Sequence, residues 1–278
     1  MISMTSKKSL KVAVVQMQST DNVDKNWKQI LTSIEEVKQQ GSADLVCFPE
    51  NSLFMRIDGE SPRTSFDLHE NYFIQLKKIS QQLSTVILLG SLPYNNKGST
   101  YNSSILISPN GDCTPVYDKI HLFDVDVKGH KPVRESDQFV HGSEPAVVDI
   151  KGWKLGLSIC YDLRFAELYT QYARKEVDVI LVPAAFLVPT GKAHWHVLLR
   201  ARAIENQCYI IAPAQVGPNV GLNQSIRETY GHSLVVNPWG EVVMDLGNSG
   251  QKVQVVELDA EAIVRTRTQI PMRQHRRL

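Results

Sequence analysis

The chain has 278 residues, of which 42% are hydrophobic, and its 30 basic and 29 acidic side chains leave a formal net charge of +1. A chain of this length and composition can bury one sizeable core, so we expect a single domain over residues 1–278 with its core at about 11–265. The nearly balanced charge excludes the basic footprint that nucleic acid or an anionic membrane requires. A small molecule is therefore the expected partner.

Neither a membrane segment nor a signal peptide is expected. The longest apolar runs are shorter than the roughly 18 residues that a membrane-spanning helix needs. Gln16 and Gln18 interrupt the first run, and no small-residue cleavage site follows it. The 4 cysteines lie far apart without a CxxC pair, so neither a zinc knuckle nor a disulfide framework is indicated. We expect a cytoplasmic protein.

Short apolar runs alternate with helical patterns along the chain. Residues 22–41, 165–177 and 191–207 repeat apolar positions at helical spacing, and the first of these segments ends at Gly41. A turn at residues 108–112 predicts a hairpin, so an α/β protein with mixed sheets is expected. Strands are predicted at 11–17, 43–50, 85–92, 102–108, 154–160, 178–186, 208–215, 231–238 and 253–258.

Three chemically active side chains directly follow predicted strands, where α/β sheets gather their chemistry. Glu50 follows "LVCFP", Lys119 follows "PVYD", and Cys160 closes "KLGLSIC". Each has an ordinary interpretation when taken singly: the two charges as solvated loop residues, and the cysteine as a small buried hydrophobe. The long irregular segment 123–145 is a further candidate, because loops of that length in a compact domain are usually functional.

The setting of Cys160 favours a nucleophile. A strand followed at once by a tight turn and a helix lifts a side chain out of the sheet, with backbone N–H groups nearby as oxyanion donors. A thiol also needs a base, and no histidine lies near Cys160 in the sequence. A sufficiently buried glutamate can take that role.

The segments "FPE", "YDKIHLF" and "ICYDLRF", in this order and spacing, resemble the catalytic segments of the nitrilase superfamily of carbon-nitrogen hydrolases. The resemblance runs from about Lys11 to the final "QHRR". It implies an αββα sandwich of two mixed β-sheets flanked by helices. It also implies a catalytic triad of Glu50, Lys119 and Cys160, with a second glutamate at Glu135 in "RESDQF".

The mechanism that this resemblance implies follows from the residue types. Glu50 takes the thiol proton as Cys160 attacks an amide carbonyl, and Lys119 with a backbone N–H neutralises the oxyanion. A thioester intermediate remains, which water activated by Glu50 hydrolyses to a carboxylic acid. Glu135 orients Lys119 and the substrate. Neither a metal nor an organic cofactor is expected.

Within the superfamily the chain is similar to the Nit-type amidases, which include enzymes acting on deaminated glutathione and ω-amidases acting on α-ketoglutaramate. The segments "RARAIENQCYIIAPAQVG" and "RETYGHS" favour the first branch. The insertion at 216–233 supplies polar groups for a longer substrate, namely Asn223, Arg227 and Tyr230. The residues expected to contact substrate are Tyr161, Arg164, Phe186, Thr190 and Arg227.

Two other classes of protein stay open on the residues alone. A catalytically silent binding protein could keep the fold, although none of the catalytic residues is missing. A cysteine peptidase would need a histidine partner for the thiol. We further expect a homodimer or higher oligomer that associates through helix 165–177, whose apolar residues Phe165, Leu168, Tyr169 and Tyr172 exceed the obvious needs of one sheet face.

The sequence "HWH" at 194–196 invites a metal-site interpretation. Side chains at i and i+2 of a helix diverge, so His194 and His196 are not expected to bind one ion together. A packed or surface pair is the favoured interpretation.

Overall fold

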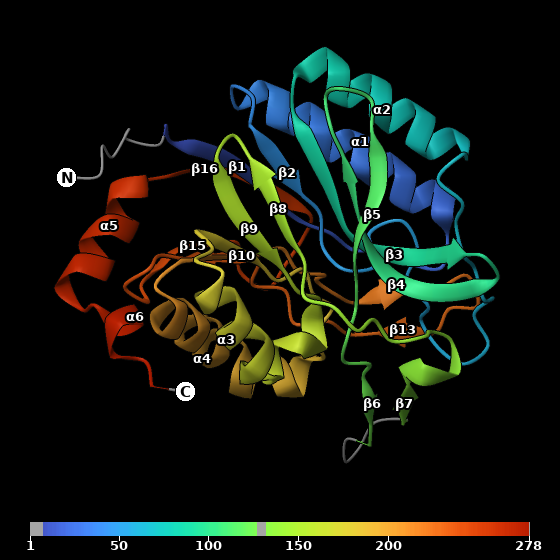
Figure 1. Cartoon of the computed structure of the whole chain (residues 1–278). Helices are drawn as coiled ribbons and strands as arrows, with labels where there is room; N and C mark the ends of the chain where they lie inside the picture. The colour runs from blue at the N-terminus through green and yellow to red at the C-terminus, as the bar shows by residue number, and fades with distance from the viewer. Residues whose placement is uncertain (1–7, 127–131, 278) are drawn as a thin grey trace.

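The computed structural model describes residues 8–126 and 132–277, so a short part of segment 123–145 lies outside the description. Two β-sheets pack face to face, with α1 and α2 covering one outer side and α3 and α4 the other (Figure 1). The predicted αββα sandwich of two mixed sheets is confirmed.

The first sheet combines parallel strands in its middle with antiparallel strands at its edges. Its order is β16 (Lys252–Leu258), β1 (Leu10–Gln16), β2 (Leu45–Cys47), β3 (Val86–Asn96), β4 (Ser99–Ile107) and β5 (Cys113–Asp118). The predicted hairpin turn at 108–112 joins β4 to β5.

The second sheet is built in the same way, with β9, β10 and β11 parallel and the other pairs antiparallel. Its order is β15 (Val242–Asp245), β14 (Leu234–Val236), β11 (Tyr209–Ala212), β10 (Val179–Leu181), β9 (Trp153–Leu157) and β8 (Val147–Ile150). Two short hairpins lie outside the sheets: β6 (Asp124–Val125) with β7 (Val133–Arg134), and β12 (Asn219–Val220) with β13 (Ile226–Arg227).

Strand β1 shows why the central strands are apolar on both faces. Val12 and Val14 belong to a core cluster that includes β9, β10 and β11 of the opposite sheet. Ala13 and Val15 belong to a second cluster with α1 and α2. Successive side chains of a strand point to opposite faces, so a strand between a sheet and a helix layer needs apolar residues throughout.

The three predicted helices are confirmed, with boundaries shifted by a few residues. Asn22 caps the first helix by accepting a hydrogen bond from Lys25 N, and Gly41 beyond its end has a φ of 93°. No helix in the ranges 8–126 and 132–277 combines the length and apolar character needed to cross a membrane. The helices are α1 (Val23–Gln39), α2 (Asn71–Leu83), α3 (Ala166–Arg174), α4 (Val188–Asn206), α5 (Ala260–Gln269) and α6 (Met272–His275).

The apolar face of α3 packs inside this chain. Leu168, Tyr169 and Tyr172 are buried, and the Tyr172 hydroxyl donates to the Leu157 carbonyl. These three residues fill the space between α3 and its own sheet, so they leave little surface for a subunit interface. Association through helix 165–177 stays a prediction, as does oligomerisation itself.

Gly90 of β3 lies against the residues that follow β2 and β10. A Cβ atom at this position would come 2.1 Å from the Phe48 carbonyl oxygen and 2.3 Å from Cβ of Pro183. Phe48 leads into Glu50, and the Pro183 carbonyl accepts the Cys160 N–H at 2.9 Å. Because glycine has no Cβ, the segment that leads to Glu50 and the segment of Pro183 can both lie close to Gly90.

Gly90→Ala is expected to lower the free energy of unfolding by about 1–3 kcal/mol, because the added methyl group forces the two segments apart. Urea unfolding measures this change. Gly59→Ala is the matched control, since no heavy atom lies within 4 Å of its added Cβ. Equal free energies of unfolding for the Gly90 variant and the unmodified chain would contradict the close approach.

Candidate active site

Four of the predicted residues reach one place from four separate segments. Glu50 follows β2, and Lys119 follows β5 directly. Cys160 opens the short 3₁₀ helix η2 (Cys160–Arg164) after β9, and Glu135 opens η1 (Glu135–Asp137). The sheet-to-sheet packing brings these segment ends together, and all four residues line one cavity.

Lys119 is the centre of the charged group. Its ammonium Nζ lies 2.8 Å from Oε1 of Glu50, and 3.0 and 2.8 Å from the two carboxylate oxygens of Glu135. The side chains of Lys119 and Glu50 are 1% and 3% exposed. Such burial is tolerable only because each charge is paired and hydrogen-bonded.

Asn102 holds the two carboxylates in place, and its role is not evident from the sequence. Its side-chain amide donates to Glu50 Oε1 at 3.1 Å and to Glu135 Oε1 at 3.0 Å. The Phe123 N–H donates to the other Glu135 oxygen at 2.6 Å. A neutral asparagine in a β-strand carries no recognisable signal, so only the fold reveals this contact.

Burial and ion pairing act in opposite directions on Lys119. Burial lowers the pKa of its ammonium, but Glu135 and Glu50 outweigh that effect and leave the pKa above its usual value. The two carboxylates therefore favour the protonated ammonium. It is a fixed positive charge next to the thiol.

Cys160 has the strained backbone of a nucleophile elbow. Its φ is 48°, a left-handed conformation that side chains other than glycine rarely adopt. Burial raises the pKa of its thiol well above the usual value, the charge of Glu50 raises it further, and Lys119 offsets only part of this. Burial and the charge of Glu50 thus favour the neutral thiol over the thiolate.

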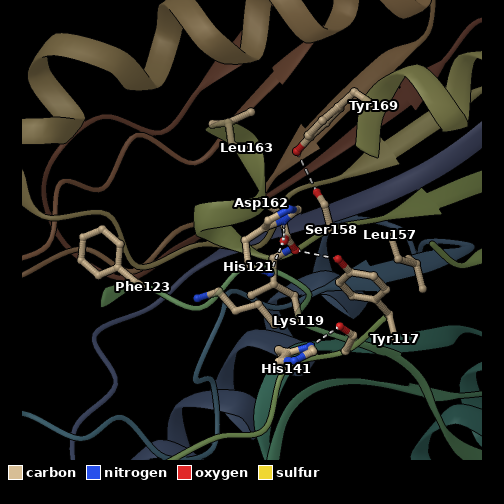
Figure 2. A network of polar contacts seen from close by, with 12 residues as sticks. Tyr117, Lys119, His121, Phe123, His141, Leu157, Ser158, Asp162, Leu163 and Tyr169 are labelled. Atoms are coloured by element: carbon tan, nitrogen blue, oxygen red, sulfur yellow. Dashed lines mark hydrogen bonds and ion pairs between the residues drawn. The ribbon is translucent and has the colours of Figure 1, made fainter. Parts of the chain in front are cut away.

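A buried aspartate two residues past the cysteine ties two catalytic segments together (Figure 2). The Asp162 carboxylate accepts the Tyr117 hydroxyl at 2.7 Å and the His121 backbone N–H at 2.9 Å, and lies 2.7 Å from His121 Nδ1. It also accepts the Ile159 N–H at 2.8 Å. The residues on both sides of Lys119 are thereby fixed to the turn that carries Cys160.

The cavity in front of Cys160 has a volume of about 1410 Å³. Small-molecule sites typically measure roughly 300–1,000 Å³, so this one has room for a substrate longer than a single amino acid. Its wall carries four arginines, namely Arg56, Arg63, Arg134 and Arg227, together with Asp58, Glu60, Asp137 and Glu228.

Comparison with known proteins identifies the arrangement. The family model described as carbon-nitrogen hydrolase matches residues 11–268. The chain belongs to the carbon-nitrogen hydrolase family. The predicted resemblance to the nitrilase superfamily is thus confirmed.

The relatives of this carbon-nitrogen hydrolase are similar along nearly its whole length. A deaminated glutathione amidase of Synechocystis sp. (strain PCC 6803 / GT-S) is 38% identical over 269 residues, covering 95% of this chain and 97% of the relative. A Mus musculus protein of the same name is 36% identical and covers 96% of this chain and 83% of its own. The crystal structure of the C. elegans NitFhit protein superposes with a TM-score of 0.87 at 32% identity, covering 98% of this chain and 66% of that longer one.

Of the five residues expected to contact substrate, the structure places only Arg227 on the cavity wall. The guanidinium of Arg164 lies 3.0 Å from His194 Nδ1 and over the Phe186 ring. Thr190 bonds the Leu187 carbonyl in the first turn of α4. Arg164, Phe186, Thr190 and Tyr161 therefore do not line the cavity of this carbon-nitrogen hydrolase.

Two further residues of the insertion, Asn223 and Tyr230, are not on the cavity wall. Asn223 donates to Asp58, and the Tyr230 ring stacks on His232. The residues able to hold a metal ion lie elsewhere too: in the described ranges the one such group is His196, His232 and Asp245, none of which lines the cavity. No histidine hydrogen bond to Cys160 occurs among the described residues, which leaves the peptidase alternative without its base.

The raised pKa of the Cys160 thiol predicts an unusual pH dependence of its alkylation. A free thiol with a pKa of about 8.5 reaches its full alkylation rate near pH 9.5, whereas the Cys160 rate is expected to keep rising beyond that pH because burial and Glu50 hold the pKa up. Iodoacetamide labelling followed by peptide mass spectrometry measures the rate, with glutathione as the reference thiol. A rate that levels off near neutral pH would mean that Cys160 rests as a thiolate.

Proposed function

We propose that the chain hydrolyses the internal amide of deaminated glutathione through a thioester on Cys160. The observation that carries this proposal is the buried Lys119 ammonium, paired with Glu50 and Glu135 beside a neutral thiol in a cavity of about 1410 Å³. The similar proteins from Synechocystis sp. and Mus musculus, both named deaminated glutathione amidase, support this choice of substrate.

In the first half-reaction Glu50 acts as the general base. It takes the thiol proton while Sγ of Cys160 forms a bond to the amide carbon, and the carbonyl oxygen becomes an oxyanion. The Lys119 ammonium and the Tyr161 backbone N–H stabilise that oxyanion. The C–N bond then breaks, and the departing amine receives the proton from Glu50.

The second half-reaction reverses the roles with water as the nucleophile. Glu50 takes a proton from the water that attacks the thioester, and the C–S bond breaks as the carboxylic acid forms. The sulfur regains its proton from Glu50, which restores the resting enzyme. Glu135 keeps Lys119 in place in both halves, and the chain needs no metal or organic cofactor for these steps.

The leaving group decides between the two candidate substrates. α-Ketoglutaramate loses ammonia, whereas deaminated glutathione loses a dipeptide that ends in a carboxylate. Both share the keto-acid end, so contacts to that end do not discriminate between them. A substrate with a dipeptide leaving group needs a long cavity and a cation for its terminal carboxylate. The cavity of about 1410 Å³ supplies the room, and Arg227 on its wall supplies the cation.

Arg227 is held on the wall by its neighbours. Its guanidinium Nη1 donates to the Arg56 carbonyl at 3.1 Å. The loop between β12 and β13 is fixed to the 56–61 segment through Asp58, which accepts the side-chain amide of Asn223 at 3.1 Å and the hydroxyl of Ser225. In the described ranges no carboxylate forms an ion pair with Arg227, which leaves its charge for an anionic ligand.

Replacement of the nucleophile tests the chemistry. Cys160→Ala and Cys160→Ser are expected to abolish amide hydrolysis and leave the far-UV circular dichroism spectrum unchanged, because only the attacking atom is altered. Mass spectrometry of acid-quenched unmodified enzyme should find the acyl group on Cys160. Cys113→Ser is the control, and hydrolysis at the original rate by either Cys160 variant would refute the mechanism.

The substrate is tested by the ratio of two specificity constants. We expect kcat/KM for deaminated glutathione to exceed that for α-ketoglutaramate at least about tenfold, which is roughly 1.4 kcal/mol of transition-state binding. Arg227→Ala should shrink the ratio by lowering only the first constant, since α-ketoglutaramate has no distal carboxylate. Arg200→Ala, outside the cavity, should leave the ratio unchanged.

Equal or higher efficiency with α-ketoglutaramate would instead assign the chain to the ω-amidases. The roles proposed for Glu50, Lys119 and Cys160 would be unaffected by that result. Absence of hydrolysis of both substrates, with intact folding, would favour the catalytically silent alternative.

A further inference from the structure

A cluster of two histidines and an aspartate lies outside the catalytic cavity. His196 Nε2 is 3.0 Å from Asp245 Oδ2, and His232 Nδ1 is 3.0 Å from the same oxygen. All the candidate ligand atoms lie within 4.8 Å of one another. The side chains are 33%, 22% and 29% exposed for His196, His232 and Asp245, so solvent reaches the cluster.

Three separate elements hold these side chains in place. His196 is on α4, Asp245 ends β15, and His232 precedes β14, whose Leu234 pairs with Asp245. The His232 N–H donates to the Gly247 carbonyl at 2.8 Å, and its own carbonyl accepts Trp195 Nε1 of α4 at 2.8 Å. The backbones that carry the ligands are therefore fixed to one another before any ion binds.

The donor set selects a class of ion. Two imidazoles and a carboxylate suit zinc and neighbouring first-row transition metals, whereas calcium and magnesium prefer oxygen ligands throughout. Tetrahedral zinc with bonds of about 2.0–2.1 Å separates its ligand atoms by about 3.3 Å. Both N–O separations are already close to that value, so only the two imidazoles need to approach each other.

We propose that His196, His232 and Asp245 form a binding site for a zinc-class divalent ion, with a water molecule in the fourth position. The ion links α4 to the β14–β15 hairpin. Its coordination requires each imidazole to present a bare nitrogen where it now hydrogen-bonds to Asp245, which a shift of the proton to the other ring nitrogen provides.

The carboxylate is ready for this role. Burial raises the pKa of Asp245, but hydrogen bonds from His196, Gly247 and His232 outweigh it and leave the pKa below the usual value. These contacts favour the ionised carboxylate, which is the form that binds a metal ion.

The ordinary alternative is that the aspartate only accepts hydrogen bonds from two histidines. The two interpretations differ in what happens when zinc is added. Titration of chelator-treated full-length chain with Zn²⁺ by calorimetry should show one ion per chain, and Co²⁺ should give visible d–d absorption. The melting temperature should rise with Zn²⁺ concentration, because an ion that binds only the folded state stabilises it.

His196→Ala should weaken Zn²⁺ binding at least about 10- to 100-fold, since even loss of an outer-shell partner of a metal ligand costs that much. His194→Ala is the matched control: it lies two residues away on the same helix and pairs with Arg164 instead. All titrations are repeated in a Cys160→Ala background, so that zinc bound to the catalytic thiol is not counted.

The site is refuted if the unmodified chain binds no Zn²⁺, or if His196→Ala and His194→Ala bind it equally well. Loss of binding in the Cys160→Ala background would assign the ion to the active site instead. Amide hydrolysis by the chelated enzyme should continue, because none of the three ligands lines the catalytic cavity. The metal measurement therefore stands or falls independently of the substrate.

Discussion

The buried Lys119 ammonium between two carboxylates is the interaction on which the rest of the site depends. Removing these charges from water costs several kcal/mol for each ion, and only close pairing with further hydrogen bonds offsets that cost. The contacts of 2.8 to 3.0 Å with Glu50 and Glu135, together with the amide of Asn102, supply both the pairing and the further hydrogen bonds.

Two carboxylates and one ammonium leave one negative charge beside Cys160. Together with burial, the charge of Glu50 raises the pKa of the thiol, and in the proposed mechanism the same carboxylate is the base that removes the proton. When the proton moves to Glu50 in that mechanism, the negative charge passes to the substrate oxygen while Lys119 stays in place.

The two-sheet architecture is what brings this group together. Glu50 and Lys119 extend from strands of the first sheet, and Cys160 extends from a strand of the second. Neither sheet alone contains a base, a cation and a nucleophile. The packing of the two sheets therefore determines the distances between these three side chains. The close approach at Gly90 affects those distances as well as the stability of the fold. The cluster at His196 lies beyond this interface, on the second sheet and its covering helix. A metal ion bound at this proposed site would act on the packing of α4, because none of its three ligands lines the catalytic cavity.

The sequence predicts the fold class well because the central strands must be apolar on both faces, and such runs stand out. Helix α2 is not recognised from the sequence for a physical reason: Glu70 at its N-cap makes no side-chain hydrogen bond, and Ser84 at its C-cap adopts a left-handed conformation without being glycine.

The ordered motifs predict Glu50, Lys119, Glu135 and Cys160 as site residues, because each lies at the end of a recognisable segment. The direction in which a side chain points is harder to predict from the sequence. Arg164 follows the nucleophile closely in sequence, yet it points to α4 because His194 and the Phe186 ring hold it there. Asn102 and the cluster at His196 depend on contacts between distant segments, which spacing along the chain does not encode.

The strained conformation of Cys160 completes the connection between fold and chemistry. A left-handed residue other than glycine costs roughly 1–3 kcal/mol and persists only where its surroundings determine it fully. Here the Cys160 N–H is held by the Pro183 carbonyl, and Asp162 anchors the turn on the other side. Because Asp162 also accepts the Tyr117 hydroxyl and the His121 N–H, the contacts that maintain the elbow also position the segment that carries Lys119. One buried carboxylate therefore aligns the proposed nucleophile Cys160 with the proposed oxyanion-stabilising cation Lys119.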